Sequence, residues 1–450
     1  MKILLISANT LKAPYPVYPI GLDHVAASIH GRHQVHIADL NVLDGPGVLA
    51  DRIRECDPHL IGISLRNIDN TDTSDPVGFI GGYRAVMTTV RQASHAPVVL
   101  GGSGFTLFPG RILGELGADF GIVGEGERLN GLIDALEAGQ HPKGLPGVIT
   151  PAEEEIPFPA PWTGERRPRL EHLSAHQRWY LAHGGILNLQ TKRGCPFGCI
   201  YCTYPLIEGR KLRRVAPRDA ARTALALEAK GARYLYITDS SFNADIDHSL
   251  EVAGAFIRAG LTIPWGAFFT PLPMPDGYFE TLAQAGLKHV EFGTDSLSDK
   301  VLRSYGKPFT VDQVLAVHEA ALAAGRHVAH YFLLGGPGET RQTLEETLTQ
   351  IDTLRKAVLF FFCGMRVYPH TALFHQCAEK GYLDAQRDLL APVFFNGGNM
   401  GDDEILQRVN EKAAGRANWV VGSGGRETAA TIARMYQKGF SGPLWEHLIR

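Results

Sequence analysis

Short runs of consecutive apolar residues alternate with amphipathic stretches through the first 150 positions of the chain. Such runs are typical of parallel strands, which are buried on both faces and need no polar alternation. They are Met1–Ser7, Val35–Ala38, Leu60–Leu65, Pro97–Leu100 and Phe120–Val123. Helical periodicity between them, as in Tyr18–His30 and Gly81–Ala93, predicts an α/β fold with a doubly wound, Rossmann-like parallel sheet. In such sheets, ligands bind beyond the carboxyl ends of the strands.

The alternation stops after about position 150 and restarts near Ile186. Six further strand-like runs each lead into a helical stretch. They are Ile186–Thr191, Tyr234–Thr238, Trp265–Thr270, His289–Phe292, Val328–Leu334 and Ala357–Met365. The Pro- and Glu-rich stretch Pro142–Arg169 indicates an extended linker. The last segment has helical spacing, which predicts a small cap over the second unit or a docking surface.

These patterns predict four parts. We expect a first domain over 1–150, a linker over 151–180, a second domain over 181–390 and a helical cap over 391–450.

Composition excludes several classes of protein. The chain has 450 residues, 44% of them hydrophobic and 20% charged, with a net charge of -3. This balance gives no reason to expect nucleic acid or a membrane as a partner. The apolar start after Lys2 is too short for a signal peptide, and no apolar run reaches membrane-spanning length. Because Cys56, Cys363 and Cys377 are scattered, we expect free thiols in a reducing cytoplasm.

The other three cysteines are concentrated in eight residues. Cys195, Cys199 and Cys202 form a CxxxCxxC pattern. Zinc sites of this kind normally have a fourth Cys or His ligand nearby, and none follows within about forty residues. Three thiolates can instead hold three irons of a 4Fe–4S cluster, whose fourth iron then remains open to a substrate or cofactor.

This spacing, together with the Gly194-Cys195-Pro196 start, resembles that of the radical S-adenosylmethionine (SAM) superfamily. The resemblance implies a partial (βα)6 barrel. It also implies a 4Fe–4S cluster on the three cysteines, with SAM bound at the open iron. Electrons would come from a donor protein such as flavodoxin or ferredoxin.

The same resemblance suggests further SAM contacts at the ends of later strands. They are Tyr201 beside the adenine, Asp239 and Ser240 near the methionyl amino group, Glu291 and Ser296 at the ribose and carboxylate, and Gly336, Gly338 and Glu339 in the turn that supports the adenine. Two of these residues have structural alternatives, because Tyr201 can pack in the core and Glu339 can cap the following helix.

Three strand ends in the first domain are rich in glycine and small polar residues. Taken in order ahead of the cysteine motif, they resemble the cobalamin-binding domain of cobalamin-dependent radical SAM enzymes. The resemblance implies cobalamin contacts at Ser64, Leu65, Arg66, Asn67, Gly101, Gly102, Ser103, Gly104, Phe105, Thr106, Gly124, Glu125 and Gly126. The DxHxxG motif, which supplies a histidine ligand to cobalt in related domains, is absent.

Arg66 is of particular interest because it directly follows a strand, where the lower face of a corrin would lie. A guanidinium has no free lone pair and therefore cannot ligate cobalt. We hypothesise that Arg66 keeps the lower face of cobalt poorly coordinated, which favours labile methyl transfer. The alternative is a salt bridge to Asp69 or Asp72.

The combined resemblance implies a class B methyltransferase that methylates an unactivated carbon or phosphorus of a small molecule. Two alternatives remain: radical chemistry without methyl transfer, such as ring formation, rearrangement or oxidation, and a non-catalytic accessory protein. Polar residues near strand ends are candidates for binding the substrate, although packing is the commoner role of such residues. They are Tyr204, Tyr331, Tyr368, His330, His370 and Arg366.

Overall fold

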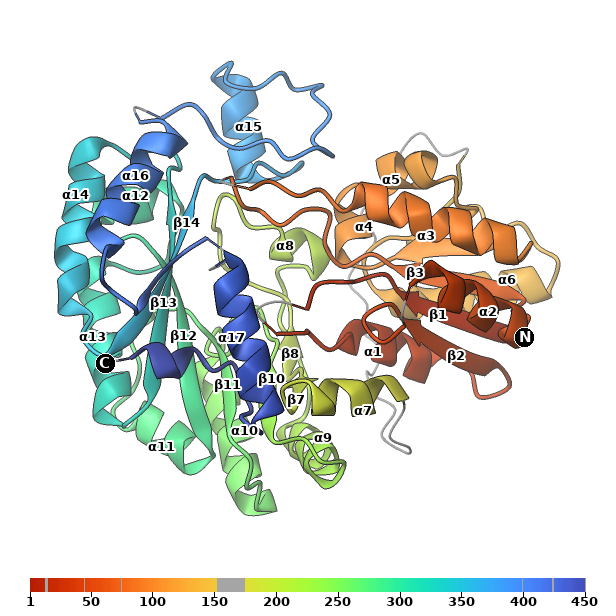
Figure 1. Cartoon of the computed structure of the whole chain (residues 1–450), viewed down its shortest axis with the longest axis horizontal. Coiled ribbons are helices and arrows are strands. Elements are labelled where there is room, and N and C mark those ends of the chain that lie inside the picture. Colours follow the sequence, from red (N-terminus) through yellow and green to blue (C-terminus); the bar gives the residue numbers. More distant parts are fainter. Residues whose placement is uncertain are drawn as a thin grey trace.

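The computed structural model consists of two α/β units, each built on its own parallel sheet (Figure 1). It describes residues 1–12, 15–43, 45–73, 75–151, 175–398, 400–422 and 425–449. Most of the predicted linker therefore lies outside the described residues. The first unit, red to orange in Figure 1, lies beside the second, which runs from green to blue.

The first sheet has the strand order β2-β1-β3-β4-β5-β6, and all its pairs are parallel except β5 with β6. The strands are β1 (Lys2–Ser7), β2 (Gln34–Asp39), β3 (Leu60–Ser64), β4 (Val98–Gly101), β5 (Phe120–Ile122) and β6 (Val148–Ile149). The helices are α1 (Ile20–Ser28), α2 (Pro46–Cys56), α3 (Ile80–Ala93), α4 (Ser103–Leu107), α5 (Pro109–Leu116) and α6 (Leu129–Glu137). This confirms the predicted doubly wound sheet. Its switch point lies between β1 and β3, where such folds bind ligands.

The second sheet follows the chain from edge to edge, in the order β15-β14-β13-β12-β11-β10-β7. Its strands are β7 (Ile186–Leu189), β10 (Tyr234–Ile237), β11 (Trp265–Phe269), β12 (Leu287–Asp295), β13 (His327–Leu334), β14 (Ala357–Cys363) and β15 (Trp419–Val421). All neighbours are parallel, as in an open (βα) barrel. The six predicted strands are present. The last segment, which was expected to be mostly helical, also contributes β15, which extends the sheet beyond β14.

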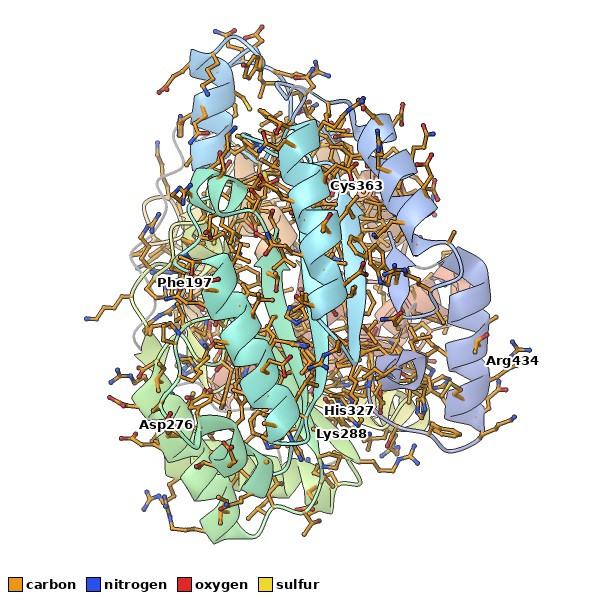
Figure 2. The ribbon with its side chains drawn as sticks, turned by 90° about the vertical axis from the view of Figure 1, so that its left-hand side faces the viewer. Phe197, Asp276, Lys288, His327, Cys363 and Arg434 are labelled. Atoms are coloured by element: carbon orange, nitrogen blue, oxygen red, sulfur yellow. The ribbon has the colours of Figure 1, made fainter. Side chains whose placement is uncertain are left out.

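Helices cover the outer face of this sheet, and Figure 2 shows them in front of the strands. The helices of the second unit are α7 (Ala175–Ala182), α8 (Tyr204–Ile207), α9 (Pro217–Ala229), α10 (Ile246–Ala259), α11 (Tyr278–Gln284), α12 (Asp299–Ser304), α13 (Val311–Ala323), α14 (Arg341–Gln350), α15 (Ala372–Glu379), α16 (Asp402–Ala413) and α17 (Gly425–Gln437). Of these, α8 lies not on the outer face but next to α4 of the first unit. Capping boxes at Thr310 and Thr340 fix the starts of α13 and α14. Across the described ranges, no helix combines the length and apolarity needed to cross a membrane.

The chain ends inside the barrel rather than over its mouth. After α17, the backbone N–H of Gly442 donates to the carbonyl of Gly184, just before β7. In the terminal 3-10 turn (Trp445–Leu448), Glu446 pairs with Lys288 at 2.7 Å. Figure 2 shows Lys288 near the amino ends of β12 and β13, with Cys363 at the opposite end. The tail therefore closes the barrel at the end opposite the mouth. The sequence analysis had suggested a cap over the mouth itself.

Two segments of the first unit reach the second one, and both follow strands at the switch point. Tyr15, after β1, packs against Tyr234 and Tyr236 of the barrel. After β3, Asp69 accepts a hydrogen bond from Arg366 at 2.9 Å, and Thr73 donates to the carbonyl of Cys363. The contacts after β3 bring its carboxyl end to that of β14, whereas Tyr15 reaches the amino end of β10.

The Asp69–Arg366 pair provides the first testable prediction. The two side chains are 0% and 3% exposed, and removing one partner of such a pair leaves a buried, uncompensated charge. We expect Arg366→Met to lower the free energy of unfolding by about 3–5 kcal/mol, measured by thermal or denaturant unfolding. Adding Asp69→Asn to that variant should restore part of the loss.

The exposed pair Arg111–Asp388 is a matched control, because it also joins the two units. Arg111→Ala should cost about 0–1 kcal/mol. Equal losses for Arg366→Met and Arg111→Ala would contradict a special role for the buried pair.

Candidate active site

The three motif cysteines lie in one loop, between the short strand β8 (Lys192–Arg193) and α8. Burial raises the pKa of all three thiols, that of Cys202 to about 12, and the charges of Cys195 and Cys199 add to its shift. As free thiols they would therefore be protonated at neutral pH. Binding to iron removes the thiol proton, so the donor set fits a cluster that supplies its own positive charge.

Elsewhere in the described ranges, as here, no three His, Cys, Asp or Glu side chains stand close enough to share one metal ion. Each cysteine of a 4Fe–4S cluster binds a different iron, so the three sulfurs need not converge on one ion.

Asp239, predicted to contact SAM, holds the base of the cysteine loop. Its carboxylate accepts hydrogen bonds from the backbone N–H groups of Thr191 (2.7 Å) and Lys192 (3.1 Å), and from Lys192 Nζ (2.9 Å). Neighbouring Ser240 donates to Glu208, which also accepts from the backbone N–H of Gly194. Both polar residues of this strand end thus support the loop that carries the cysteines.

The polar atoms of two other predicted SAM residues, Ser296 and Glu291, are hydrogen-bonded within the protein. Ser296 is fully buried and bonds to Thr347 at 3.0 Å. Glu291 is 1% exposed and accepts hydrogen bonds from Tyr236, Tyr331 and Trp445, so it anchors the C-terminal tail inside the barrel.

Glu339 keeps one carboxylate oxygen available. Its Oε1 accepts from Thr343 at 2.6 Å, whereas its Oε2 is buried without a partner. The suggestion that Glu339 caps the next helix is wrong, because the cap of α14 is Thr340. Gly336 and Gly338 lie in the same turn, and the backbone N–H of Gly336 donates to the Tyr305 hydroxyl. An unpaired buried acceptor fits an N–H or O–H donor of a bound ligand.

Tyr201 leads to two residues that the sequence analysis did not single out. Its hydroxyl donates to Asp295 at 2.6 Å, and Asp295 pairs with Lys307 at 2.9 Å. Lys307 follows α12 in a loop, outside every strand-end motif. Asp295 lies at the end of β12, between the predicted Glu291 and Ser296. That position could have identified it from the sequence as a candidate site residue.

The predicted cobalamin residues also divide by exposure. The buried ones are Leu65, Gly104, Phe105, Thr106 and Glu125, and the partly or fully exposed ones are Ser64, Arg66, Asn67, Gly101, Gly102, Ser103, Gly124 and Gly126. Gly102 has φ +100°, and a Cβ there would lie 2.6 Å from the carbonyl oxygen of Leu65. This glycine is thus required for packing β4 against β3, whatever it does for a ligand.

Arg66 remains exposed at this edge. Its carbonyl accepts from Ser103 Oγ at 2.7 Å. Within the described ranges, no hydrogen bond or ion pair of its guanidinium is present, and the expected alternative partner Asp69 is taken by Arg366. A salt bridge from Arg66 to Asp69 is therefore wrong for this structure.

Glu125 links this edge to the cysteine loop. Its carboxylate pairs with Arg193, which directly precedes the motif, at 3.2 Å and with Arg213 at 2.6 Å. Arg193 also pairs with Glu208 at 3.2 Å. Glu125, which was predicted to contact cobalamin, thus forms ion pairs that join the strand ends of the first sheet to the cysteine loop of the second unit.

Most of the suggested substrate residues form hydrogen bonds with other side chains of the protein. His330 is buried between Thr294 and His318, and Arg366 and Tyr368 both contact Asp69. Tyr204 differs, since it starts α8 next to α4 and is 46% exposed.

The fold and the site define a two-domain iron–sulfur enzyme. Residues 189–351 match the radical SAM superfamily profile, and residues 6–132 match that of the B12 binding domain. The chain therefore contains a radical SAM domain and a B12 binding domain, and it is similar over most of its length to class B methyltransferases that combine the two. These two domains confirm the predicted cofactors, which are a 4Fe–4S cluster, SAM and cobalamin.

Three known proteins illustrate the similarity. Tryptophan 2-C-methyltransferase of Streptomyces laurentii is 27% identical over 84% of this chain and 74% of its own length. Cytidylyl-2-hydroxyethylphosphonate methyltransferase of Streptomyces wedmorensis is 25% identical over 88% and 85%. The structure of the radical SAM methyltransferase TsrM from Kitasatospora setae matches with a TM-score of 0.87 at 22% identity, over 99% of this chain and 97% of that one.

The support that Asp239 gives to the cysteine loop can be tested without a substrate. Asp239→Asn should weaken the buried pair with Lys192 and loosen the start of the loop, because the amide carries no charge. We expect clearly fewer irons and sulfides per chain after anaerobic reconstitution. Ser240→Ala, the control at the next position, removes only one hydrogen bond to Glu208 and should load nearly normally. Full iron loading of Asp239→Asn would contradict this role.

Proposed function

We propose that the chain transfers a methyl group to an unactivated carbon or phosphorus centre of a small molecule, using cobalamin and the SAM-loaded cluster together. The observation that carries the proposal is the contact between the two functional edges, made by Glu125 with Arg193 and Arg213. A radical reaction confined to the barrel would not require the cobalamin-domain edge to be held against the cysteine loop.

The relatives support a small-molecule substrate. One is named for methylating tryptophan at carbon 2, and another for methylating a cytidylyl hydroxyethylphosphonate. The relative from Kitasatospora setae has been solved with tryptophan and a SAM analogue, and with cobalamin and a 4Fe–4S cluster. Because the two named substrates differ in chemistry, they favour a shared reaction rather than a shared substrate.

In this proposal the chain's own residues hold and orient the reacting groups. Cys195, Cys199 and Cys202 would bind three irons of the cluster, and the free Oε2 of Glu339 would accept a hydrogen bond from SAM. When bound, the cofactors supply the radical and the activated methyl group that an unactivated centre requires. Arg66 would lie against the lower face of cobalamin and, lacking a lone pair, would leave cobalt without a protein ligand.

The substrate would lie between the cysteine loop and the edge of the first sheet. Tyr204 is the exposed polar side chain next to this region, at the start of α8. Its hydroxyl stays protonated at neutral pH, because the ordinary pKa of a tyrosine is about 10. We propose that Tyr204 donates a hydrogen bond to the substrate.

Counting the products of SAM tests the proposed reaction. The reconstituted, reduced enzyme is supplied with cobalamin and SAM and incubated with candidate small molecules. Methyl transfer by a radical route should give both S-adenosylhomocysteine and 5′-deoxyadenosine, with a methyl mass gain in the substrate. 5′-Deoxyadenosine alone would indicate radical chemistry without methylation, and S-adenosylhomocysteine alone would indicate polar methyl transfer. An enzyme that cleaves no SAM under any condition would contradict the proposal.

The role of Arg66 can be examined in the cobalamin-loaded protein. We expect Arg66→Ala to let water reach the lower face of cobalt, which changes the absorption and EPR spectra of bound cobalamin and slows turnover. Arg54→Ala removes an exposed arginine of α2 in the same domain and should leave both unchanged. Unaltered cobalt coordination and unaltered turnover in Arg66→Ala would rule the idea out.

A further inference from the structure

Lys307 is held against the cysteine loop by the backbone around it. The carbonyl of Tyr305 accepts a hydrogen bond from the backbone N–H of Ile200 at 3.0 Å. Gly306 has φ +70°, and a Cβ there would lie 2.7 Å from the carbonyl oxygen of Gly198. Only glycine permits this approach. The segment before Lys307 therefore lies directly on the loop between the first and second motif cysteines.

The Lys307 ammonium reaches the cysteines from this position. Its side chain is 7% exposed, pairs with Asp295 at 2.9 Å and donates a hydrogen bond to the Tyr201 hydroxyl at 3.5 Å, next to Cys202. Its charge acts on all three motif cysteines. The ion pair with Asp295 compensates the charge of this buried ammonium. The lysine is thus a fixed cation beside the cluster ligands.

Asp295 is aimed at the same place by an irregular piece of backbone. The pairing of β12 with β13 shifts register between Gly293 and Asp295, and Asp295 has φ +61°. A non-glycine residue in this left-handed region is uncommon and is retained where its surroundings enforce it. Bulges of this kind redirect side chains near active sites. Here the redirected carboxylate receives the Tyr201 hydroxyl and the Lys307 ammonium.

We propose that Lys307 and Asp295 are positioning residues that set the reduction potential of the 4Fe–4S cluster. The inference rests on the proposed binding of that cluster by Cys195, Cys199 and Cys202. Reduction adds one electron to the cluster, taken from a low-potential donor such as a flavin or iron–sulfur protein. A nearby cation stabilises the added negative charge, and a nearby carboxylate opposes it.

Because Lys307 and Asp295 are both buried, water screens their charges little, and these charges can shift the reduction potential of the cluster. Charges around an iron–sulfur cluster and hydrogen bonds to its sulfurs are known determinants of its potential. Because the charge of Lys307 acts on Cys199 more strongly than that of its partner Asp295, the net effect of the intact pair is to raise the potential. This makes the cluster easier to reduce before SAM is cleaved.

The two charges allow a test by opposite shifts. The full-length enzyme is reconstituted anaerobically with iron and sulfide and titrated with dithionite and mediators, with EPR of the reduced cluster as the readout. We expect Lys307→Met to lower the potential and Asp295→Asn to raise it. Lys307→Arg keeps the charge and should stay near the wild type. Lys300→Met, an exposed position on α12, is the matched control and should show no shift.

Shifts of the same sign in Lys307→Met and Asp295→Asn, or no shift in either, would overturn the proposal. If Lys307→Met fails to load, Lys307→Gln keeps a polar side chain of similar shape, and its potential must fall below that of the wild type. Iron content separates the two levels of the argument. A wild-type chain that cannot hold four irons would overturn the proposed function and this inference with it. A loaded cluster with an unshifted potential would overturn the Lys307–Asp295 role alone.

Discussion

The rest of the structure depends on a buried charge network that joins two sheet edges. Glu125 comes from the end of the first sheet, and Arg193 and Arg213 come from the base of the cysteine loop. Each α/β unit can fold its own ligand-binding edge, but neither fixes the orientation of the other. A substrate shared by two cofactors requires that orientation to be fixed within a small error. Ion pairs shielded from water are directional and little screened by salt, which suits this task better than apolar packing does.

The same constraint explains why several residues at the strand ends are engaged with protein. In an isolated doubly wound domain, the segments after β1 and β3 would be free to surround a ligand. Here they also build the interface, through the contacts of Tyr15 inside the barrel and the pair of Asp69 with Arg366. What remains exposed at this edge, with Arg66 as its one long charged side chain among the predicted contacts, is the part available to cobalamin.

The sequence predicts what is local and misses what depends on distant contacts. Apolar runs identify the strands because a buried parallel strand requires them, and the CxxxCxxC pattern identifies the cluster loop because its ligands are neighbours in the chain. β15 escaped detection because three residues carry too little pattern. The pairing of Asp239 with Lys192 was not predicted, because a carboxylate at a strand end looks the same in the sequence whether or not a lysine pairs with it. The contact of Tyr201 with Asp295 spans 94 positions, and no local pattern encodes it.

Two buried lysine–aspartate pairs flank the cysteine loop, and their energetics indicate what they are for. Lys192 pairs with Asp239 at its base and Lys307 with Asp295 at its side, each at 2.9 Å. Removing two charges from water costs about as much as their attraction returns, so such pairs add little stability over apolar residues of similar size. Here the two pairs serve to hold particular groups in place. Lys192 and Asp239 face the backbone and fix where the loop begins, whereas Lys307 lies beside Tyr201 within the cysteine motif, where its charge would act on the proposed cluster.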